Sequence, residues 1–597
     1  MARLTVAPAI VVLGAGALPV AERIRARYQG ATIHALAGRA EGDVAFSELG
    51  AHLRALYARG NPVVALCAAG IVIRCVAPCL ADKGVEPPVL AVAEDGSAVV
   101  PLLGGLTGVN LLAREIAETL GIAPAITTSG ELRFGACVLN PPEGYALADI
   151  GAGKRFVSDL LAGASTRVDG AAPWLEGVAL PVDAAGSHAI RVTPRRARGA
   201  GSGELLIHPR SVVVALAEGS AHRAASLAAP AQAADHEAGG DPLARRILDA
   251  LAAADLSPLA LAALVAPRQC MREAALARAA RELGVPLRFV ASKADPADAA
   301  ALLDAALAAG SIDASPAITL DDDGKPSTSL AIAIAEAPVD ANRLGQARGS
   351  LSVLGLGPGR ADLLAPAARL ALAEATDILG YATYVRMAGP FRADQRVHET
   401  DNREELQRAR HAFELAAQGR RVAMVSSGDP GVFAMAAAVL EALDGAGEPA
   451  WDEVALEVVP GVSAAFATAA EAGAPLGHDF CVISLSDNLK PWSVIEERLA
   501  LAARADLVMA FYNPISKARP WQLDRALEIL REIRAADTVV VLGRDVGRPG
   551  ASLRSLTLGE LRAADVDMRT MVIVGSSKTR RFASAEREWI YTPRFYD

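Results

Sequence analysis

Cysteine is scarce in this sequence, with six residues in 597, and no two of them form a CxxC pair. So few thiols without paired spacing exclude a disulfide-stabilised scaffold and predict a reducing, cytoplasmic location. The one cluster, Cys67, Cys75 and Cys79, has no histidine nearby. Small buried hydrophobic side chains are therefore favoured there over metal ligands, and no metal is expected.

Long apolar runs and a basic excess are also missing. No apolar stretch reaches the ~18 residues that suggest a membrane span, and the first 28 residues lack a signal-peptide cleavage pattern. The net charge of -9 gives the protein as a whole no attraction to nucleic acid or to an anionic membrane. Neither is an expected partner, so local cations would have to meet any anionic ligand.

The chain has the composition of a folded, core-rich protein, with 52% hydrophobic and 21% charged residues. Its 597 residues exceed one ordinary core and predict several domains. Alternating strand and helix patterns predict α/β architecture throughout. The predicted divisions are a first domain at 1–140, a central region at 141–216, a linker at 217–240, a third domain at 241–338, a linker at 339–349 and a last domain at 350–597.

Two glycine loops in the first domain are candidate ligand sites. The loop that starts at Gly14 carries Pro19 where a dinucleotide-binding loop needs its third glycine, and no acidic residue ends the next strand. A plain α/β scaffold is therefore favoured over a nucleotide site. The loop from Gly104 to Asn110 opens a helix and is compatible with either an anion site or a tight turn.

The run CAAGIVIRCVAPCLADKGVEPPVLAVAEDGSAVVPLLGGLTGVNLLAREIAETLG resembles the N-terminal domain of the cobalt-precorrin-5A hydrolase family of cobalamin biosynthesis. That family has Ser-Gly-His where this chain has Gly104, Gly105 and Leu106. The loop thus loses its only titratable group, and no obvious general acid or base remains. Two later segments, ELGVPLRFV and SLAIAIAEA, resemble the family's C-terminal domain. The family's usual Gly-Cys-Arg-Arg and Asp-Leu-Lys segments are not apparent, so the resemblance concerns the fold more than the functional site. The resemblance implies a hydrolase-like half with lost or altered chemistry.

The stretch from Val422 to Phe433, VAMVSSGDPGVF, organises the last domain. An apolar run of strand length stops at two serines and then at Gly428, Asp429, Pro430 and Gly431. This pattern predicts a buried parallel strand with a binding loop at its carboxyl end.

Five motifs occur in order: LGLGPGRADLL, SSGDPGVF, VPGVSAA, AFYNP and MVIVG. Together they resemble the tetrapyrrole (corrin/porphyrin) methylase family, over roughly residues 350–583. NLKPWSVIEERL and YNPISKARPWQL resemble its precorrin-3B C17-methyltransferase branch. The resemblance implies a two-lobed α/β domain that uses S-adenosyl-L-methionine to methylate precorrin-3B at C17, with ring contraction to precorrin-4. It also implies a homodimer.

The resemblance assigns cofactor contacts to the motif loops. They are Gly357, Pro358, Ser427, Gly428, Asp429, Val432, Phe433, Ser463, Ala464, Tyr512, Asn513, Thr570, Met571 and Val572. Ring contraction should need a base near a substrate hydroxyl, for which Asp429, His478 and Asp545 are the candidates. An ordinary structural role is favoured for each, and the sequence does not choose among them.

Cations near the same loops should meet the many carboxylates of the family's substrate. They are Arg360, Lys490, Lys517, Arg519, Arg544, Arg548 and Lys578. Any single one is more simply a solvated surface residue, so the expectation concerns the group. Arg360 stands where many relatives carry aspartate.

The altered loop at Gly104 to Leu106 favours a metal-free substrate. Two alternatives stay open for the N-terminal half: a module that carries tetrapyrroles to the methylase, or an active cobalt-precorrin-5A hydrolase with the methylase acting on cobalt-factor III. A methylase of the same fold acting on RNA or protein is disfavoured, because a basic excess is missing.

Overall fold

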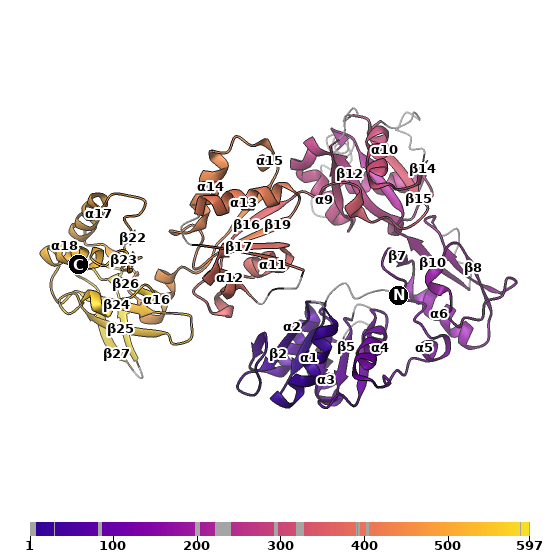
Figure 1. Ribbon diagram of the computed structural model, residues 1–597, viewed down its shortest axis with the longest axis horizontal. Coiled ribbons are helices and arrows are strands. Elements are labelled where there is room, and N and C mark those ends of the chain that lie inside the picture. Colours follow the sequence, from indigo (N-terminus) through magenta and orange to yellow (C-terminus); the bar gives the residue numbers. More distant parts are fainter. Residues whose placement is uncertain are drawn as a thin grey trace. The chain divides into compact units, whose positions relative to one another are not determined.

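The computed structural model describes residues 7–28, 30–80, 86–196, 203–220, 240–291, 297–317, 328–389, 391, 394–401, 405–584 and 587–595. The chain divides into two compact units. Residues 1–348 and 390–394 form the first unit, and residues 349–389 and 395–597 form the second. Figure 1 labels many of their helices and strands.

The first sheet of the first unit has six strands in the order β3-β2-β1-β4-β5-β6, and only β6 runs antiparallel to its neighbour. The strands are β1 (Ala9–Val12), β2 (Thr32–Leu36), β3 (Val44–Phe46), β4 (Val63–Leu66), β5 (Val89–Val92) and β6 (Val99–Leu103). The helices are α1 (Leu18–Arg27), α2 (Leu49–Ala58), α3 (Ala69–Val76) and α4 (Val109–Leu120). Successive β1 side chains enter opposite cores: Ile10 packs with α1 and α4, and Val11 with α2 and α3. Helices therefore cover both faces, as in a doubly wound fold. The cysteine cluster lies here, with Cys67 buried after β4.

A histidine pair links the edge of this sheet to α2. His34 Nδ1 and His52 Nε2 share a hydrogen bond of 2.8 Å, and the ring of Phe46 stacks on His52 at 4.5 Å. Burial, and then the neighbouring His52, lowers the pKa of His34 from 6.5 to about 4. Burial also lowers the pKa of His52. Both rings are therefore neutral in the folded unit at neutral pH.

This pair predicts acid sensitivity of the first unit. His34 binds a proton below about pH 6.5 in the unfolded chain but only below about pH 4 in the folded unit. Its contribution to stability is therefore complete above pH 6.5 and is lost as the pH falls towards 4. Going from pH 7 to pH 5 should lower the local free energy of opening by about 2 kcal/mol. Amide hydrogen exchange of β2 measures this. His34→Leu should flatten the dependence, and His411→Gln, at a partly exposed position of the second unit, should not. An unchanged slope in His34→Leu would refute the assignment.

The second sheet has four strands in the order β7-β10-β9-β8, with β7 antiparallel to β10. Its elements are α5 (Ser129–Phe134), β7 (Tyr145–Leu147), α6 (Ile150–Leu161), β8 (Thr166–Asp169), β9 (His188–Val192) and β10 (Glu204–Pro209). Phe134 of α5 and Phe156 of α6 fill its core against Ile190 and Ile207. The helices α5 and α6 thus lie on this sheet, where they form one side of a cavity described below.

The third sheet has five strands in the order β13-β12-β11-β15-β14. Its elements are β11 (Val212–Leu216), α8 (Pro242–Ala253), β12 (Leu261–Pro267), α9 (Ala274–Glu282), β13 (Leu287–Val290), α10 (Ala299–Gly310), β14 (Ala314–Ala317) and β15 (Leu330–Ala335). The predicted boundary at residue 216 differs from the structure, because β11 forms the centre of this sheet rather than the end of the central region. Most of the predicted linker, residues 221–239, lies outside the described residues.

The second unit begins with a lobe built on an all-parallel sheet in the order β18-β17-β19-β16-β20. The strands are β16 (Ser350–Gly355), β17 (Asp377–Tyr381), β18 (Arg396–Thr400), β19 (Arg421–Ser426) and β20 (Ala455–Val459). The helices are α11 (Pro366–Glu374), α12 (Ala382–Ala388), α13 (Glu405–Ala417), α14 (Met435–Asp444) and α15 (Pro449–Asp452). Because all strands are parallel, the loops that follow β16, β19 and β20 meet at one edge.

The other lobe carries a mixed sheet in the order β22-β23-β26-β24-β25 and a small sheet in the order β21-β28-β27. The strands are β21 (Gly473–Ala474), β22 (Phe480–Ser484), β23 (Val508–Tyr512), β24 (Val539–Arg544), β25 (Ser552–Thr557), β26 (Thr570–Val574), β27 (Arg580–Ser584) and β28 (Arg587–Tyr591). The helices are α16 (Ala464–Ala472), α17 (Trp492–Arg504) and α18 (Gln522–Ile533). α17 and α18 cover one face of the mixed sheet, and α16 covers the other.

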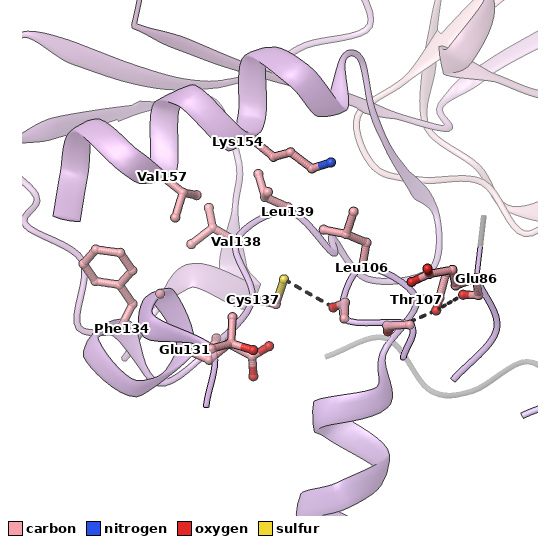
Figure 2. A pocket seen from close by; sticks show the side chains of 15 residues that line it. Glu86, Leu106, Thr107, Glu131, Phe134, Cys137, Val138, Leu139, Lys154 and Val157 are labelled. Carbon is pink, nitrogen blue, oxygen red and sulfur yellow. Dashed lines mark hydrogen bonds between the residues drawn. The ribbon is translucent and has the colours of Figure 1, made fainter. Parts of the chain in front are cut away.

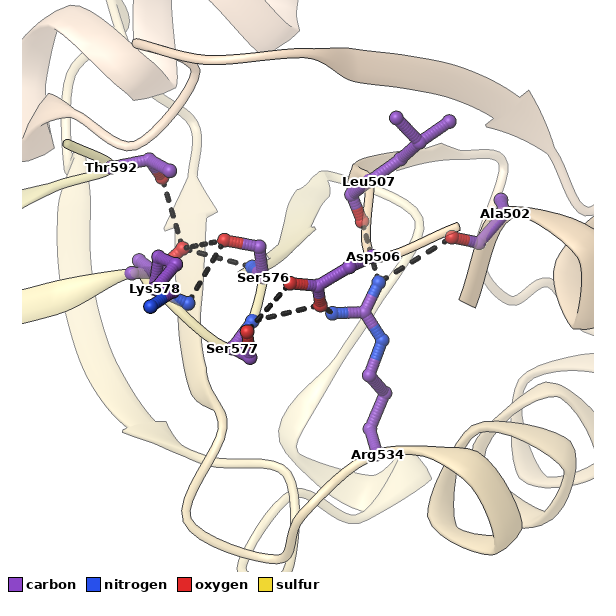
Figure 3. Close-up of polar contacts among 9 residues, drawn as sticks. Ala502, Asp506, Leu507, Arg534, Ser576, Ser577, Lys578 and Thr592 are labelled. Carbon is purple, nitrogen blue, oxygen red and sulfur yellow. Dashed lines mark hydrogen bonds and ion pairs between the residues drawn. The ribbon is translucent and has the colours of Figure 1, made fainter. Parts of the chain in front are cut away.

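The buried Arg534, at the end of α18, contacts the residues just before β23 (Figure 3). Arg534 forms an ion pair with Asp506 and donates to the Leu507 carbonyl oxygen at 3.0 Å. Asp506 also accepts from the backbone N–H of Ser577 at 2.9 Å and from its hydroxyl at 2.6 Å. Because Asp506 accepts from both Arg534 and Ser577, this network holds the loop after β26 against the start of β23.

Among the described residues, no helix combines the length and the apolar character that crossing a membrane requires.

Candidate functional site

Two of the motif loops bind each other directly at the carboxyl edge of the parallel sheet. Gly357 and Gly428 exchange two backbone hydrogen bonds, of 3.1 and 2.8 Å. A β-carbon on Gly355 would lie 2.6 Å from the Gly428 carbonyl oxygen and 2.7 Å from the Gly461 nitrogen. Side chains at this crossing would collide with backbone, so the glycines allow three loops to pack together.

Asp429 ties two of these loops to each other. Its Oδ1 accepts from the Gly431 N–H at 2.8 Å, and its Oδ2 accepts from the Gly461 N–H at 3.0 Å. Both carboxylate oxygens are therefore committed to backbone groups of the loops after β19 and β20. This geometry makes Asp429 a positioning residue.

Aromatic and hydroxyl groups from both lobes meet beside Asp429. The Tyr512 hydroxyl, at the end of β23, hydrogen-bonds to the Ser463 hydroxyl and accepts from the Ala465 N–H at 3.2 Å. The Phe433 ring lies 5.3 Å from the Tyr512 ring, and the Lys490 ammonium lies 5.9 Å from the centre of Phe433. Tyr512 thus joins the first turn of α16 to the end of β23, and its ring contacts Phe433 of the other lobe.

Backbone strain is concentrated in the same loops. Of the six non-glycine residues with positive φ in the described ranges, three are Phe433, Asn513 and Asp545, at 52°, 51° and 51°. Phe433 also leaves 51% of its surface exposed. A bulky exposed ring in the left-handed region is unfavourable unless its surroundings impose it, and such residues gather at functional sites.

Arg548 connects the second lobe to the glycine loops of the first. It follows β24, and its guanidinium donates from Nε to the Pro358 carbonyl oxygen and from Nη2 to the Ser427 hydroxyl, both at 3.0 Å. Asp545 holds the turn that carries it: its carboxylate accepts from Arg569 Nε at 2.7 Å and from Arg544 Nη1 at 3.1 Å. Asp545 is 5% exposed and fully paired, which makes it a second positioning residue.

Comparisons with known proteins identify the families that two parts of the chain match. Residues 350–562 match the family described as Tetrapyrrole (Corrin/Porphyrin) Methylases, and residues 51–131 match Cobalamin synthesis G N-terminal. The chain is 53% identical over 249 residues to the "Precorrin-3B C(17)-methyltransferase" of Sinorhizobium sp, covering 42% of this chain and 97% of that protein. The chain belongs to the tetrapyrrole methylase family.

Two further comparisons follow, and the second unit is called the methylase unit from here on. Over 285 residues the chain is 46% identical to "Cobalamin biosynthesis protein CobIJ" of Mycobacterium tuberculosis, covering 47% of this chain and about half, 54%, of that protein. The solved "Crystal structure of the methyltransferase CobJ" is 52% identical, with 41% of this chain and 100% of that chain covered and a TM-score of 0.39. The predicted α/β multidomain fold and the fusion of hydrolase-like and methylase segments are confirmed, and the chain is a methyltransferase.

The methylase unit brings most of the predicted cofactor residues to one group of loops. Gly357, Pro358, Ser427, Gly428, Asp429, Phe433, Ser463 and Tyr512 are joined by the contacts above, and Val432 and Ala464 are their chain neighbours. Asn513 follows Tyr512 and donates to the Ser484 hydroxyl at 3.1 Å. Thr570 and Met571 begin β26 just beyond the point where its pairing with β23 stops, at Phe511 and Val572. Val572 itself packs into the core under α17 and α18.

His478 is not part of this group. It precedes β22, whereas Ser484 and Tyr512 end the parallel strands β22 and β23, so the length of a strand separates His478 from the motif loops. Its Nδ1 accepts from the Asp479 N–H at 2.8 Å. His478 therefore lies at the opposite end of β22 from Ser484, which is near the motif loops.

The predicted cations of the methylase unit fall into different settings. Arg360 pairs with Asp362, and Arg544 pairs with Asp567 at 2.8 Å and with Asp545. Arg360 and Arg548 both border a cavity of about 430 Å³, which also includes Glu471. Lys490 is half-buried at Phe433, where burial and then Arg498 lower its pKa. Arg519 donates to the Asn513 carbonyl oxygen at 3.0 Å, and Lys517 is exposed.

Sequence reasoning missed Ser426. It is 1% exposed, lies opposite Gly355 in the sheet register, and its hydroxyl has no hydrogen-bond partner among the described residues. A buried hydroxyl without a partner costs free energy unless a bound group satisfies it. The backbone groups of the motif loops and the hydroxyls of Ser427 and Ser463 fit a nucleoside cofactor without phosphate.

Proposed function

We propose that the methylase unit transfers a methyl group from S-adenosyl-L-methionine to C17 of precorrin-3B, with ring contraction to precorrin-4, in cobalamin biosynthesis. The observation that supports this most is the 53% identity across 97% of a relative named for that reaction. The motif loops, joined through Gly357, Gly428 and Gly461, supply the matching site.

The cofactor is assigned to the loops around Asp429. When bound, S-adenosyl-L-methionine supplies an electrophilic methyl group on a sulfonium. Ser426, Ser427, Ser463 and the backbone near Met571 are the groups we assign to its polar edges, with Phe433 and Tyr512 as its aromatic wall. The contribution of these residues is to hold two reacting centres close and aligned.

None of the three predicted bases has a free group placed at the motif loops in the described residues. Asp429 and Asp545 accept hydrogen bonds or ion pairs on both oxygens, and His478 lies at the far end of its strand. We therefore assign Asp429 and Asp545 to positioning rather than to proton transfer.

Lys490 is the residue we assign to a substrate carboxylate, because its half-buried ammonium lies beside Phe433. Lys490→Met should raise the KM for precorrin-3B about 5-fold and leave kcat unchanged, as loss of one partly exposed ion pair would. Steady-state methyl transfer measures both constants. Arg504→Met, an exposed residue at the end of α17, should change neither. A fall in kcat with constant KM would contradict this role.

The direct test is incubation of the purified chain with precorrin-3B and S-adenosyl-L-methionine labelled in the methyl group. Label in a ring-contracted macrocycle is expected. Cobalt-factor III in a parallel reaction distinguishes the metal-free from the cobalt-bound substrate. Absence of label from both macrocycles would remove the proposal.

For the N-terminal half, we propose that hydrolase chemistry is lost. Leu106 takes the place of the family's histidine and lines an apolar cavity. Cobalt-precorrin-5A should therefore release no acetaldehyde in the presence of this chain.

We further propose a homodimer, which sedimentation equilibrium of the full chain would test.

A further inference from the structure

A cavity of about 360 Å³ lies in the first unit (Figure 2). On one side is the glycine loop before α4, and on the other are α5, the segment 136–139 and α6. Apolar side chains form most of its wall: Leu106, Phe134, Ala136, Val138, Leu139 and Val157. Its volume falls within the ~300–1,000 Å³ of small-molecule sites.

One carboxylate of the lining is neutralised. Glu131 is 4% exposed; its Oε1 accepts from Asn110 Nδ2 and its Oε2 from Arg114 Nη1, each at 2.7 Å. Thr107 donates its hydroxyl to the Glu86 carbonyl oxygen at 2.6 Å. Because Glu131 is paired, its carboxylate is not available as a base, and none of the lining residues is a histidine. Its geometry suits binding rather than hydrolysis.

Lys154 supplies the one ammonium group of the lining. It extends from α6 past Leu139 in Figure 2, and it has no ion pair or hydrogen-bond partner among the described residues. Glu86, the other charged lining residue that has no ion-pair partner within the described ranges, lies on the glycine-loop side. An anionic group is therefore favoured on the α6 side, next to Lys154.

We propose that this cavity binds an amphipathic carboxylate, with its apolar body against Leu106, Phe134 and Val157 and its carboxylate paired with Lys154. Two sources have this chemistry: a small free acid, or one carboxylate-bearing edge of a tetrapyrrole too large to enter whole. The site is separate from the methylase unit, so it stands whether or not the methylation proposal holds.

Calorimetric titration of the full chain with octanoate and with octanol tests the site. Octanoate should bind, and Lys154→Met should weaken it about 5-fold while leaving octanol unchanged. Arg155→Met is the matched control, because Arg155 is the next residue of α6 and does not line the cavity. It should change octanoate affinity less than about 2-fold.

A second variant fills the cavity. A β-carbon on Gly105 would meet no atom within 4 Å, so Gly105→Phe should be accommodated and should weaken both ligands at least about 10-fold. Competition between uroporphyrin III and octanoate on the wild type separates the sources: displacement of octanoate indicates the tetrapyrrole edge, and no displacement indicates the free acid. No octanoate binding to the wild type, or octanoate binding unchanged in Lys154→Met, would overturn the proposal. Amide hydrogen exchange of β10 in each variant reports that the first unit is folded.

Discussion

Asp429→Asn should weaken the binding of S-adenosylhomocysteine by a factor of ~30 to ~150. The carboxylate accepts one backbone N–H from each of two loops, Gly431 at 2.8 Å and Gly461 at 3.0 Å. An amide has only one oxygen, so one N–H must face an NH₂ group or lose its partner. Loss of a hydrogen bond to a charged group costs roughly 2 to 3 kcal/mol, which is a factor of ~30 to ~150 in Kd.

Calorimetry with S-adenosylhomocysteine and methyl-transfer kinetics on the same preparation separate the two roles that Asp429 could have. A positioning residue affects affinity for the product and kcat/KM together. A proton-transferring base would instead lower turnover and leave S-adenosylhomocysteine affinity unchanged, and that result would contradict our assignment. Asp444→Asn, an exposed carboxylate at the end of α14, is the matched control and should bind as the wild type does.

The sequence predicted the α/β fold well because periodicity reports burial directly. The apolar run before Ser426 is a central buried strand, β19, and its loop lies at the carboxyl edge as expected. The boundary at residue 216 was not predictable in the same way. Val212 to Leu216 is an apolar run that fits the centre of either neighbouring sheet, and only pairing with β12 and β15 assigns it. Strand partners depend on tertiary packing, which a local pattern does not encode.

The sequence predicted which loops form the site, but it did not predict what the individual residues of those loops do. Glycines and a Pro-flanked aspartate mark where strands end, and the structure joins Gly357, Gly428 and Asp429 as that pattern implies. The function of Asp545 depends on Arg569, 24 residues away, and that of Arg548 on Pro358, 190 residues away. No spacing rule links such distant residues. Arg548 was therefore one cation among seven, although its contacts set it apart from the others.

Arg548→Met should lower kcat/KM about 30-fold with little change in the melting temperature. Its guanidinium donates to the Pro358 carbonyl oxygen and to the Ser427 hydroxyl, so it fixes two loops of one lobe from a turn of the other. Loss of both bonds at a partly exposed position costs roughly 2 kcal/mol, or about 30-fold. Arg580→Met, an exposed position on β27, should leave kcat/KM unchanged.

Arg548→Lys distinguishes the shape of the guanidinium from its charge. Two acceptors in fixed directions suit a planar fork, whereas an ammonium keeps the charge but not the fork. If the fork holds the loops, lysine should restore less than about a third of the lost activity, and the KM for S-adenosyl-L-methionine should stay raised in both variants. Full restoration by lysine would mean that Arg548 acts only as a charge towards the substrate. A melting temperature that falls together with activity would mean that it acts only on stability.

Because Asp545 holds the turn that carries Arg548, Asp545→Asn should reproduce the raised KM of Arg548→Met, and the double variant should add little to either.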